Sequence, residues 1–273
     1  MTVAQPSALA RSLRSAFDAH LGELRRRRFE RRLAGPKLIK AFADAIPHAF
    51  FVEVGANDGE QHDHLRPFIL SREWKGIMVE PVPYVFERLR HNYAAVDGVI
   101  LENAVVGVRD GTLPFYHLVD ATDDERRRLP GWYDGIGSLS KEAVLRHAAH
   151  IPDIADRLIC RTVPSLTFES LCTKHGVEKV DLLVIDTEGY DWELIRRIDF
   201  STRRPQVLVY EHYHLSPEDR VACTTYLTEL EFRIVEEGFD TFCLDVHADS
   251  RLQTAWSRAR PAVSGVSVHE EGS

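Results

Sequence analysis

The sequence lacks the patterns of several common protein classes. Its four cysteines (Cys160, Cys172, Cys223 and Cys243) contain no C-x-x-C pair. This argues against a zinc site or a redox dithiol and is typical of reduced thiols in a cytosol. No apolar run approaches the roughly 18 residues that span a bilayer, and the first residues lack the apolar stretch of a secretory signal. We therefore expect a cytoplasmic protein that does not enter a membrane.

Excess positive charge is also missing. The 273 residues carry a formal net charge of −8, which gives little non-specific attraction to DNA or RNA. We expect a small-molecule substrate and no nucleic-acid partner. The hydrophobic share of 44% and the charged share of 28% are ordinary for a globular protein, and the length suits one large domain with additions.

The first part of the chain predicts an added helix. Apolar residues recur there every three or four positions, at Leu9, Leu13, Phe17, Leu21 and Leu24. A basic run, 25–28, follows on the same segment and fits either a solvated helix face or contact with an anionic partner. Gly35-Pro36 then punctuates the chain. We expect residues 1–46 to form an N-terminal helical extension that serves as a lid or as a homodimer contact.

The rest of the chain alternates between strand and helix patterns. Apolar strands are expected at 50–54, 76–79, 99–106, 180–185 and 207–210, helices at 84–93, 192–198 and 217–230, and two closing strands at 232–235 and 241–245. This alternation predicts an α/β fold of the Rossmann-like kind, a mostly parallel sheet with helices on both faces, over residues 47–250. Residues 107–165 interrupt the rhythm and are expected to be a substrate loop. Residues 258–273 are expected to be a disordered tail.

Ligands of such sheets bind beyond the carboxyl ends of the strands. The first strand ends in "FVEVGANDGE", where Gly55 and Gly59 allow a sharp turn and close approach to a ligand. The spacing is neither the dinucleotide fingerprint G-x-G-x-x-G nor a P-loop. An acid, Glu53, precedes the first glycine and suits a ligand that carries an amine and no phosphate, such as S-adenosylmethionine.

The next two strand ends extend this interpretation. Glu80 ends the second expected strand about 20 residues after Gly59, and a carboxylate at that place commonly binds ribose hydroxyls. Asn103 falls in or after the third strand, where an adenine edge would lie. These positions predict a nucleoside-binding site.

The fourth and fifth strand ends carry groups suited to catalysis. Asp186 and Glu188 follow "LLVI", and Glu211, His212 and His214 stand in "LVYEHYHL". Histidine titrates near neutrality and can remove a proton from an attacking hydroxyl or amine. His62 and His64, in the loop after the first glycine turn, are further candidates.

In this order the five segments resemble the FkbM family of S-adenosylmethionine-dependent methyltransferases. The resemblance rests on "VEVGANDG", "MVEPVPYVFERLRHNY", "NAVVG", "SLTFESL" and "VDLLVIDTEGYDWELI" and covers about residues 48–245. It implies a class I methyltransferase fold and O-methylation of sugars, polyketides or other secondary metabolites. Asp58, where many members have a hydrophobic residue, and the His62–His64 loop depart from the family pattern.

The strand-end residues and the resemblance together predict the site residues. The donor, S-adenosyl-L-methionine, would be bound by Glu53, Gly55, Asn57, Gly59, Glu80, Asn103, Ala104 and Asp186. The acceptor would contact His62, His64, Ser138, Glu188 and Glu211.

Three hypotheses follow from the residues. In the first, an acceptor hydroxyl displaces the donor methyl group directly while His214 or His212 removes its proton and Asp186 faces the reaction centre. A variant adds Mg²⁺ or Mn²⁺ at Asp186, Glu211 and one of these histidines, but we assign no metal ligands. The others are a nicotinamide-dependent oxidoreductase, whose G-x-G-x-x-G turn is missing, and a non-catalytic nucleoside-binding protein.

Overall fold

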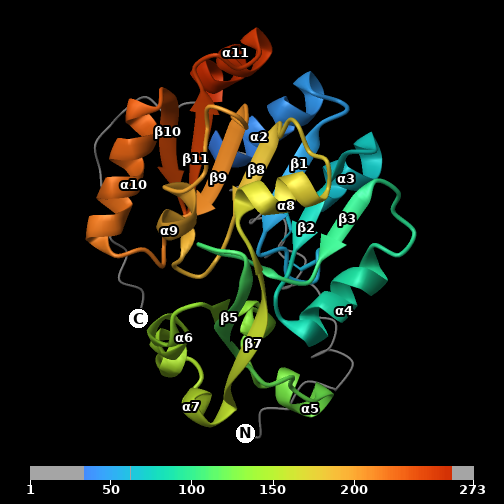
Figure 1. The fold of residues 1–273 in the computed structure, drawn as a ribbon, viewed down its shortest axis with the longest axis vertical. Helices are drawn as coiled ribbons and strands as arrows, with labels where there is room; N and C mark the ends of the chain where they lie inside the picture. Colours follow the sequence, from blue (N-terminus) through green and yellow to red (C-terminus); the bar gives the residue numbers. More distant parts are fainter. Residues whose placement is uncertain (1–33, 62, 260–273) are drawn as a thin grey trace, which may run out of the picture.

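The computed structural model describes residues 34–61 and 63–259. Two sheets organise this part of the chain (Figure 1). The larger has seven strands in the order β10-β11-β9-β8-β1-β2-β3, and the smaller has four in the order β4-β7-β5-β6. The prediction of a Rossmann-like α/β fold is confirmed.

The elements have the following bounds. They are α2 Ala34–Ala45, β1 Phe50–Val54, α3 Arg66–Arg72, β2 Lys75–Val79, α4 Pro83–Asn92, β3 Val99–Glu102, β4 Val105–Val106, β5 Gly111–Leu118, α5 Asp123–Arg126, η1 Tyr133–Gly135, β6 Gly137–Ser138, α6 Lys141–Leu145, η2 Arg146–Ala149, α7 Ile154–Arg157, β7 Leu158–Leu166, α8 Phe168–Lys174, β8 Leu182–Ile185, α9 Asp191–Ile195, β9 Val207–Glu211, α10 Pro217–Glu229, β10 Phe232–Glu237, β11 Asp240–Asp245 and α11 Ser250–Ala259.

The central strands of the large sheet are parallel and buried. β1 pairs in parallel with both β2 and β8, and β9 lies in parallel beyond β8. Two apolar clusters cover the two faces. One receives α8, α9 and α10, and the other receives α2, α3, α4 and α11. Parallel strands enclosed on both sides are mostly apolar, which explains the continuous run "LLVI" of β8.

The chain runs outward from β1 in two directions. β2 and β3 follow on one side, and β8 and β9 on the other. β11 pairs in antiparallel fashion with β9, and β10 pairs in the same way with β11 and forms the edge of the sheet. The carboxyl ends of β1 and β8 therefore meet at the switch point of the sheet, where α/β proteins bind their ligands.

The N-terminal segment differs from the expectation. The predicted amphipathic helix around residues 9–24 lies outside the described residues. Gly35 and Pro36 fall in the first turn of α2 and do not separate it from the domain. Leu38 and Phe42 of this helix are buried in the core, and α2 packs against α11. Residues 34–45 are therefore part of the α/β core, because their apolar face covers the sheet.

The expected third strand is broken. β3 ends at Glu102 and remains in the large sheet, whereas β4 begins at Val105 and pairs with β7 of the small sheet. The insertion 107–165 is thus folded. β5 and β7 form a long antiparallel pair, and a small core of its own contains Leu118, Tyr133 and Ile151. In Figure 1 this unit lies below the large sheet, with α5, α6 and α7 around it.

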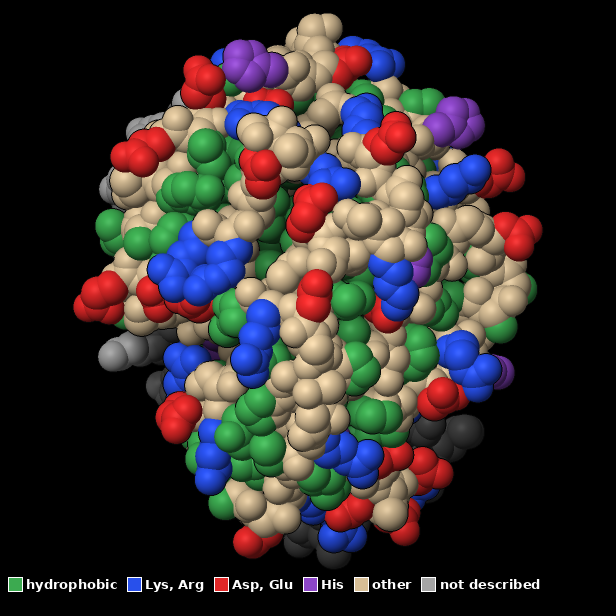
Figure 2. Space-filling model, in the orientation of Figure 1, with side chains coloured by type: hydrophobic (Ala, Val, Ile, Leu, Met, Phe, Trp, Pro, Cys, Tyr) green, Lys and Arg blue, Asp and Glu red, His purple; other side chains and the backbone are tan. Residues whose placement is uncertain are grey.

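Within residues 34–61 and 63–259, no helix is long and apolar enough to cross a membrane. On the face seen in Figure 2, basic and acidic side chains lie interspersed between hydrophobic ones. Ion pairs such as Arg220–Glu236 and Arg203–Glu169 agree with this mixed pattern. This face thus offers no single-sign field of the kind that attracts a polyanion.

Candidate active site

A cavity of about 630 Å³ opens at the carboxyl ends of β1, β2, β8 and β9. Its walls come from the strand-end loops and from the insertion, which contributes Trp132, His147 and His150. A cavity of this size at the switch point of a doubly wound sheet is the expected place for a nucleoside ligand and its reaction partner.

Gly55 brings two strand ends together. Its φ is +87°, and a Cβ added there would collide with the carbonyl oxygen of Asp186. Only glycine permits both the left-handed backbone and this close approach. Gly55 N and Ala56 N both donate hydrogen bonds to Val79 O, at 3.0 Å. The turn after β1 is thereby fixed against β2 and β8.

Gly59 has a different function from the one predicted. It is not among the residues that line the cavity. A Cβ at Gly59 would collide with the side chains of Tyr93 and Leu89, at the end of α4. Its φ of +66° also favours glycine. This residue lets the turn pack against α4, and no contact with a ligand in the cavity follows.

Glu80 lies buried in the cavity wall at the end of β2. Its carboxylate accepts hydrogen bonds from Asn57 N at 3.0 Å and from Val82 N at 2.7 Å. Burial raises the pKa of Glu80 to about 7, although these two donors act in the opposite direction. Asn57 itself takes a left-handed φ of +49°. The carboxylate therefore has a fixed position from which it can accept further hydrogen bonds.

Glu53 and Asp63 form a second acidic position on the same side. Both line the cavity. Burial raises the pKa of Glu53 well above its usual range, and the charge of Asp63 adds to this. Glu53 Oε2 has no hydrogen-bond partner. A ligand ammonium group would satisfy it. His64 also lines the cavity, whereas His62 lies outside the described residues.

Ala104 and Asn103 have separate places. Ala104 lines the cavity beside Val105. Asn103 does not, because its Nδ2 donates a hydrogen bond to Glu80 O at 2.7 Å. The predicted adenine contact of Asn103 is therefore replaced by support of the β2 end.

The ends of β8 and β9 hold a concentration of carboxylates. Asp186, Glu188 and Glu211 all line the cavity. Burial raises the pKa of Asp186 well above its usual range, and the charges of Glu211 and Glu188 raise it further. Glu188 has a left-handed φ of +53°. Non-glycine residues in this conformation occur where the surrounding structure enforces it, often at functional sites.

The histidines after β9 divide into one that faces the cavity and one that does not. His214 lines the cavity, and its Nδ1 lies 2.7 Å from Glu211 Oε2. Burial alone would lower the pKa of His214, but the hydrogen bond to Glu211 and the charge of Glu188 outweigh it and raise the pKa. His212 is buried outside the cavity wall, with its Nδ1 2.9 Å from Thr241 Oγ1. The structure therefore does not support a catalytic role for His212.

Ser138 lies behind the cavity wall and does not line it. Its hydroxyl donates to Glu188 O at 3.2 Å and accepts from Ser140 N at 3.2 Å. This contact joins the insertion to the loop after β8. Ser138 thus supports the loop that carries Glu188 from behind the cavity wall, and its contact with the acceptor stays a prediction.

Sequence reasoning missed the side chains that the insertion adds. His147 Nε2 lies 3.6 Å from Glu188 Oε2, and its ring centroid is 5.1 Å from that of His214. Trp132 contacts both His147 and His150 at ring-centroid distances of 5.2 and 5.7 Å. These residues stand in a stretch of mixed charge without a regular period, so no local pattern marked them.

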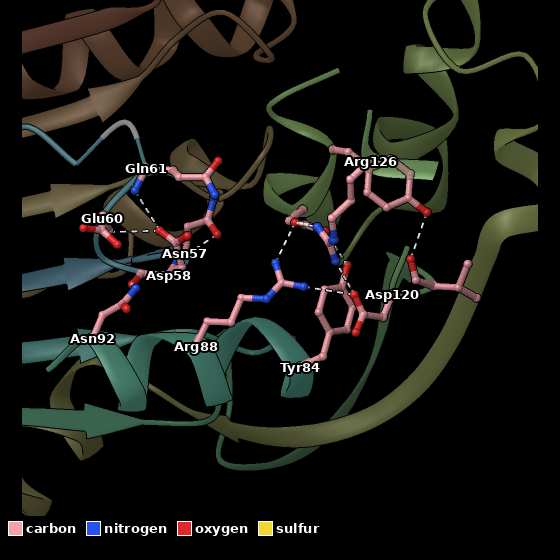
Figure 3. A network of polar contacts seen from close by, with 12 residues as sticks. Asn57, Asp58, Glu60, Gln61, Tyr84, Arg88, Asn92, Asp120 and Arg126 are labelled. Atoms are coloured by element: carbon pink, nitrogen blue, oxygen red, sulfur yellow. Dashed lines mark hydrogen bonds and ion pairs between the residues drawn. The ribbon is translucent and has the colours of Figure 1, made fainter. Parts of the chain in front are cut away.

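A charged network anchors the insertion over the cavity (Figure 3). Arg88 of α4 binds Asp134 at 2.6 Å and Asp120 at 2.9 Å, and Arg126 binds the same two carboxylates. Tyr84 donates a longer hydrogen bond to Asp134, at 3.4 Å. Because α4 follows β2, this network ties the wall of the insertion to the Glu80 side of the cavity.

One protein family matches this chain. The sequence model of the methyltransferase FkbM domain matches residues 53–240, more than half of the chain. No curated protein matches this chain. A solved structure with some likeness is a methyltransferase FkbM from Methylobacillus flagellatus KT, with 12% identity and a TM-score of 0.44, over 72% of this chain and 44% of that one. The chain therefore spans less than half of that protein.

Two other solved structures show a distant likeness. One is a precorrin-6y C5,15-methyltransferase from Geobacter metallireducens GS-15, with 10% identity and a TM-score of 0.36 over 72% of this chain and 78% of that one. The other is an RNA methyltransferase from Salinibacter ruber in complex with S-adenosyl-L-homocysteine, with 11% identity and a TM-score of 0.35 over 79% of this chain and 94% of that one.

The family assignment rests on the domain match and not on these distant structures. The match begins at Glu53 and ends at Asp240, so it includes every strand end that forms the cavity. The chain belongs to the FkbM family of S-adenosylmethionine-dependent methyltransferases.

Proposed function

We propose that the protein transfers the methyl group of S-adenosylmethionine to a hydroxyl group of a small organic molecule. The observation that carries this proposal is the division of one cavity into two ends. Fixed carboxylates at β1 and β2 suit the ammonium group and ribose of the donor, and a cluster of carboxylates and histidines at β8 and β9 suits an acceptor that must lose a proton.

At the donor end, the carboxylate of Glu80 accepts hydrogen bonds from the hydroxyl groups of the ribose. A carboxylate has two oxygens with several lone pairs, so Glu80 can keep its two backbone donors and still accept from a ligand. Glu53 faces the donor ammonium group. Ala104 lies beside the adenine, where the absence of a long side chain leaves space for the ring.

At the acceptor end, the hydroxyl oxygen attacks the methyl carbon in line with the sulfur. The new O–C bond forms as the C–S bond breaks, and the electron pair of that bond returns to sulfur. The proton of the hydroxyl passes to the hydrogen-bonded pair of Glu211 and His214. Positioning two reactants in one cavity supplies much of the rate acceleration, and Asp186 stabilises the positive charge of the donor next to the transferred methyl group.

We propose a small-molecule acceptor because the cavity is closed on one side by the insertion, whose Trp132, His147 and His150 line it. The net charge of −8 also disfavours a polyanionic substrate. A cytoplasmic location and a homodimer through the segment before residue 34 remain predictions. That segment lies outside the described residues.

Calorimetric titration of the purified protein with S-adenosylmethionine, with NAD as the control ligand, tests the donor. We expect binding of the first and none of the second. Transfer of a tritiated methyl group to a panel of hydroxylated sugars and polyketides then tests the acceptor class. Folded protein that binds no S-adenosylmethionine would contradict the proposal, and labelled amines without labelled hydroxyls would contradict O-methylation.

A further inference from the structure

Three side chains from distant parts of the sequence meet at the acceptor end of the cavity. His147 comes from the insertion, Glu188 from the loop after β8, and His214 from the loop after β9. One potential ligand atom from each lies within 4.8 Å of the other two. In the part of the chain that the structure describes, this is the single group with such metal-ligand spacing.

Two of these atoms are buried without a hydrogen-bond partner. They are His147 Nε2 and Glu188 Oε2, which lie 3.6 Å apart. His214 Nδ1 is 3.1 Å from Glu188 Oε2, but its hydrogen bond goes to Glu211 at 2.7 Å. A buried polar atom without a partner destabilises a protein, so native structures rarely keep one unless a ligand or ion satisfies it.

The surrounding contacts hold the group in place. Ser138 donates to the carbonyl of Glu188, and Arg146 donates to the carbonyl of His214 at 3.2 Å. Glu211 binds the ring of His214. Because Glu211 occupies Nδ1, Nε2 is the ring nitrogen left to ligate a metal, and a carboxylate on the opposite ring nitrogen is the usual support of a ligating histidine. Asp186 and Glu211 add negative charge to the same end of the cavity.

We propose that His147, Glu188 and His214 bind a divalent transition-metal cation. Two imidazoles and one carboxylate favour metals such as zinc, cobalt or iron(II) over magnesium or calcium, which prefer oxygen ligands. Ligand distances of about 2.0–2.2 Å require small side-chain rotations from the present positions. Three ligands leave coordination positions open toward the cavity.

This set differs from the one considered from the sequence. Asp186, Glu211 and His212 are not part of the group, and His212 is turned away to Thr241. Through its place at the acceptor end, which rests on the proposed function, the cation would contact the acceptor oxygen and favour loss of its proton. Binding of the cation itself does not depend on that function.

Titration of the chelator-treated, full-length protein with Co²⁺ tests the site. Calorimetry gives the affinity, and visible absorption reports the coordination. Cys160 is exposed, so it is replaced by serine (Cys160→Ser) in every sample. We expect one cobalt site per chain. His147→Ala and His214→Ala should each weaken cobalt binding by at least about tenfold.

His150→Ala is the matched control, because His150 lines the same cavity and contacts Trp132 but lies outside the group. It should retain the cobalt affinity of the parent protein. Glu188→Gln keeps the side-chain volume, and circular dichroism checks that each variant is folded. Glu188→Gln should weaken cobalt binding as the histidine variants do.

Absence of cobalt binding, or binding that both histidine variants leave unchanged, would overturn the proposal. Titration of the same metal-free samples with S-adenosylmethionine separates this outcome from failure of the proposed function. Donor binding without cobalt binding would leave the methyltransferase proposal intact and remove only the metal site.

Discussion

Glu80 and the carboxylates at the ends of β8 and β9 are held in different ways. At the β2 end, two backbone hydrogen bonds fix the carboxylate of Glu80. At the β8 and β9 ends, burial and the charges of Glu211 and Glu188 raise the pKa of Asp186, and both glutamates contact the ring of His214. The first arrangement fixes one hydrogen-bond acceptor for the donor, whereas the second can take up a proton or a cation.

The largest expected effect comes from breaking the junction between the two ends. In Gly55→Ala, the new methyl group would collide with Asp186 O, and the backbone would be strained at a φ of +87°. We expect a loss of at least about 3 kcal/mol in the free energy of unfolding, measured by urea denaturation.

Gly176→Ala is the control for that variant. Gly176 has a φ of +65°, but a Cβ there would meet no atom within 4 Å. It should cost only about 1 kcal/mol. Equal losses in the two variants would show that the β1–β8 junction has no special importance.

Removal of one charge at the acceptor end should have the next largest effect. Asp186→Asn keeps the shape of the side chain but cannot ionise, whereas the carboxyl of Asp186, whose pKa is raised by burial and by the charges of Glu211 and Glu188, can lose its proton beside the positively charged donor. The protein should stay folded and bind its donor, while turnover falls by about 100-fold or more because the site loses its electrostatic match to the reacting donor. Turnover equal to that of the parent protein would make Asp186 a purely structural residue.

A smaller effect is expected at the donor end. Glu80→Ala removes the proposed acceptor of the ribose hydroxyls, so calorimetry should show donor binding weakened by about 1–3 kcal/mol. The ordinary acceptor-side chemistry should be retained at saturating donor. Unchanged affinity would remove Glu80 from the donor site.

The pH dependence sharpens the same comparison. The pKa of Glu80 is raised from 4.5 to about 7, so its carboxyl is protonated in acid. Donor affinity should rise with pH up to about 7. Stability should fall over the same range, because the folded state binds a proton that the unfolded state has released. In Glu80→Gln, both slopes should flatten, and a parent-like slope of donor affinity in that variant would assign the titration to another group.

The smallest effect is expected at His212, in contrast to His214. His212→Ala removes one buried hydrogen bond to Thr241 and should cost about 1 kcal/mol in stability with turnover unchanged. His214→Ala should lower turnover by about 100-fold. If the His212 variant loses turnover and the His214 variant does not, the assignment of the cavity wall to His214 is wrong.

Much of this arrangement could be predicted from the sequence. Buried parallel strands are continuous apolar runs, so the ends of β1, β2, β8 and β9 were recognisable from the residues that follow them. Polar groups at those ends fall at one edge of the sheet, which is why Glu80, Asp186, Glu211 and His214 were found together. The family pattern added Ala104.

The pairing of strands that are distant in the chain could not be predicted from the sequence. Glu102 and Asn103 interrupt the apolar residues between Val99 and Val106, but two polar residues alone do not show that the chain changes sheets between β3 and β4. His147 was invisible for the same reason, since only the fold of the insertion carries it to Glu188. His212 and His214 look alike in sequence, and the turn at residues 213–214, directly after β9, decides which of them faces the cavity.

The place where the insertion leaves and rejoins the chain has a further consequence. β4 and β7 are paired, with Val105 beside Ser165, so the two ends of this long segment are neighbours. A segment with neighbouring ends can be lengthened, shortened or exchanged without changing the register of the large sheet. Grafting this unit between relatives would therefore be a route to enzymes with new acceptors and an inherited donor site.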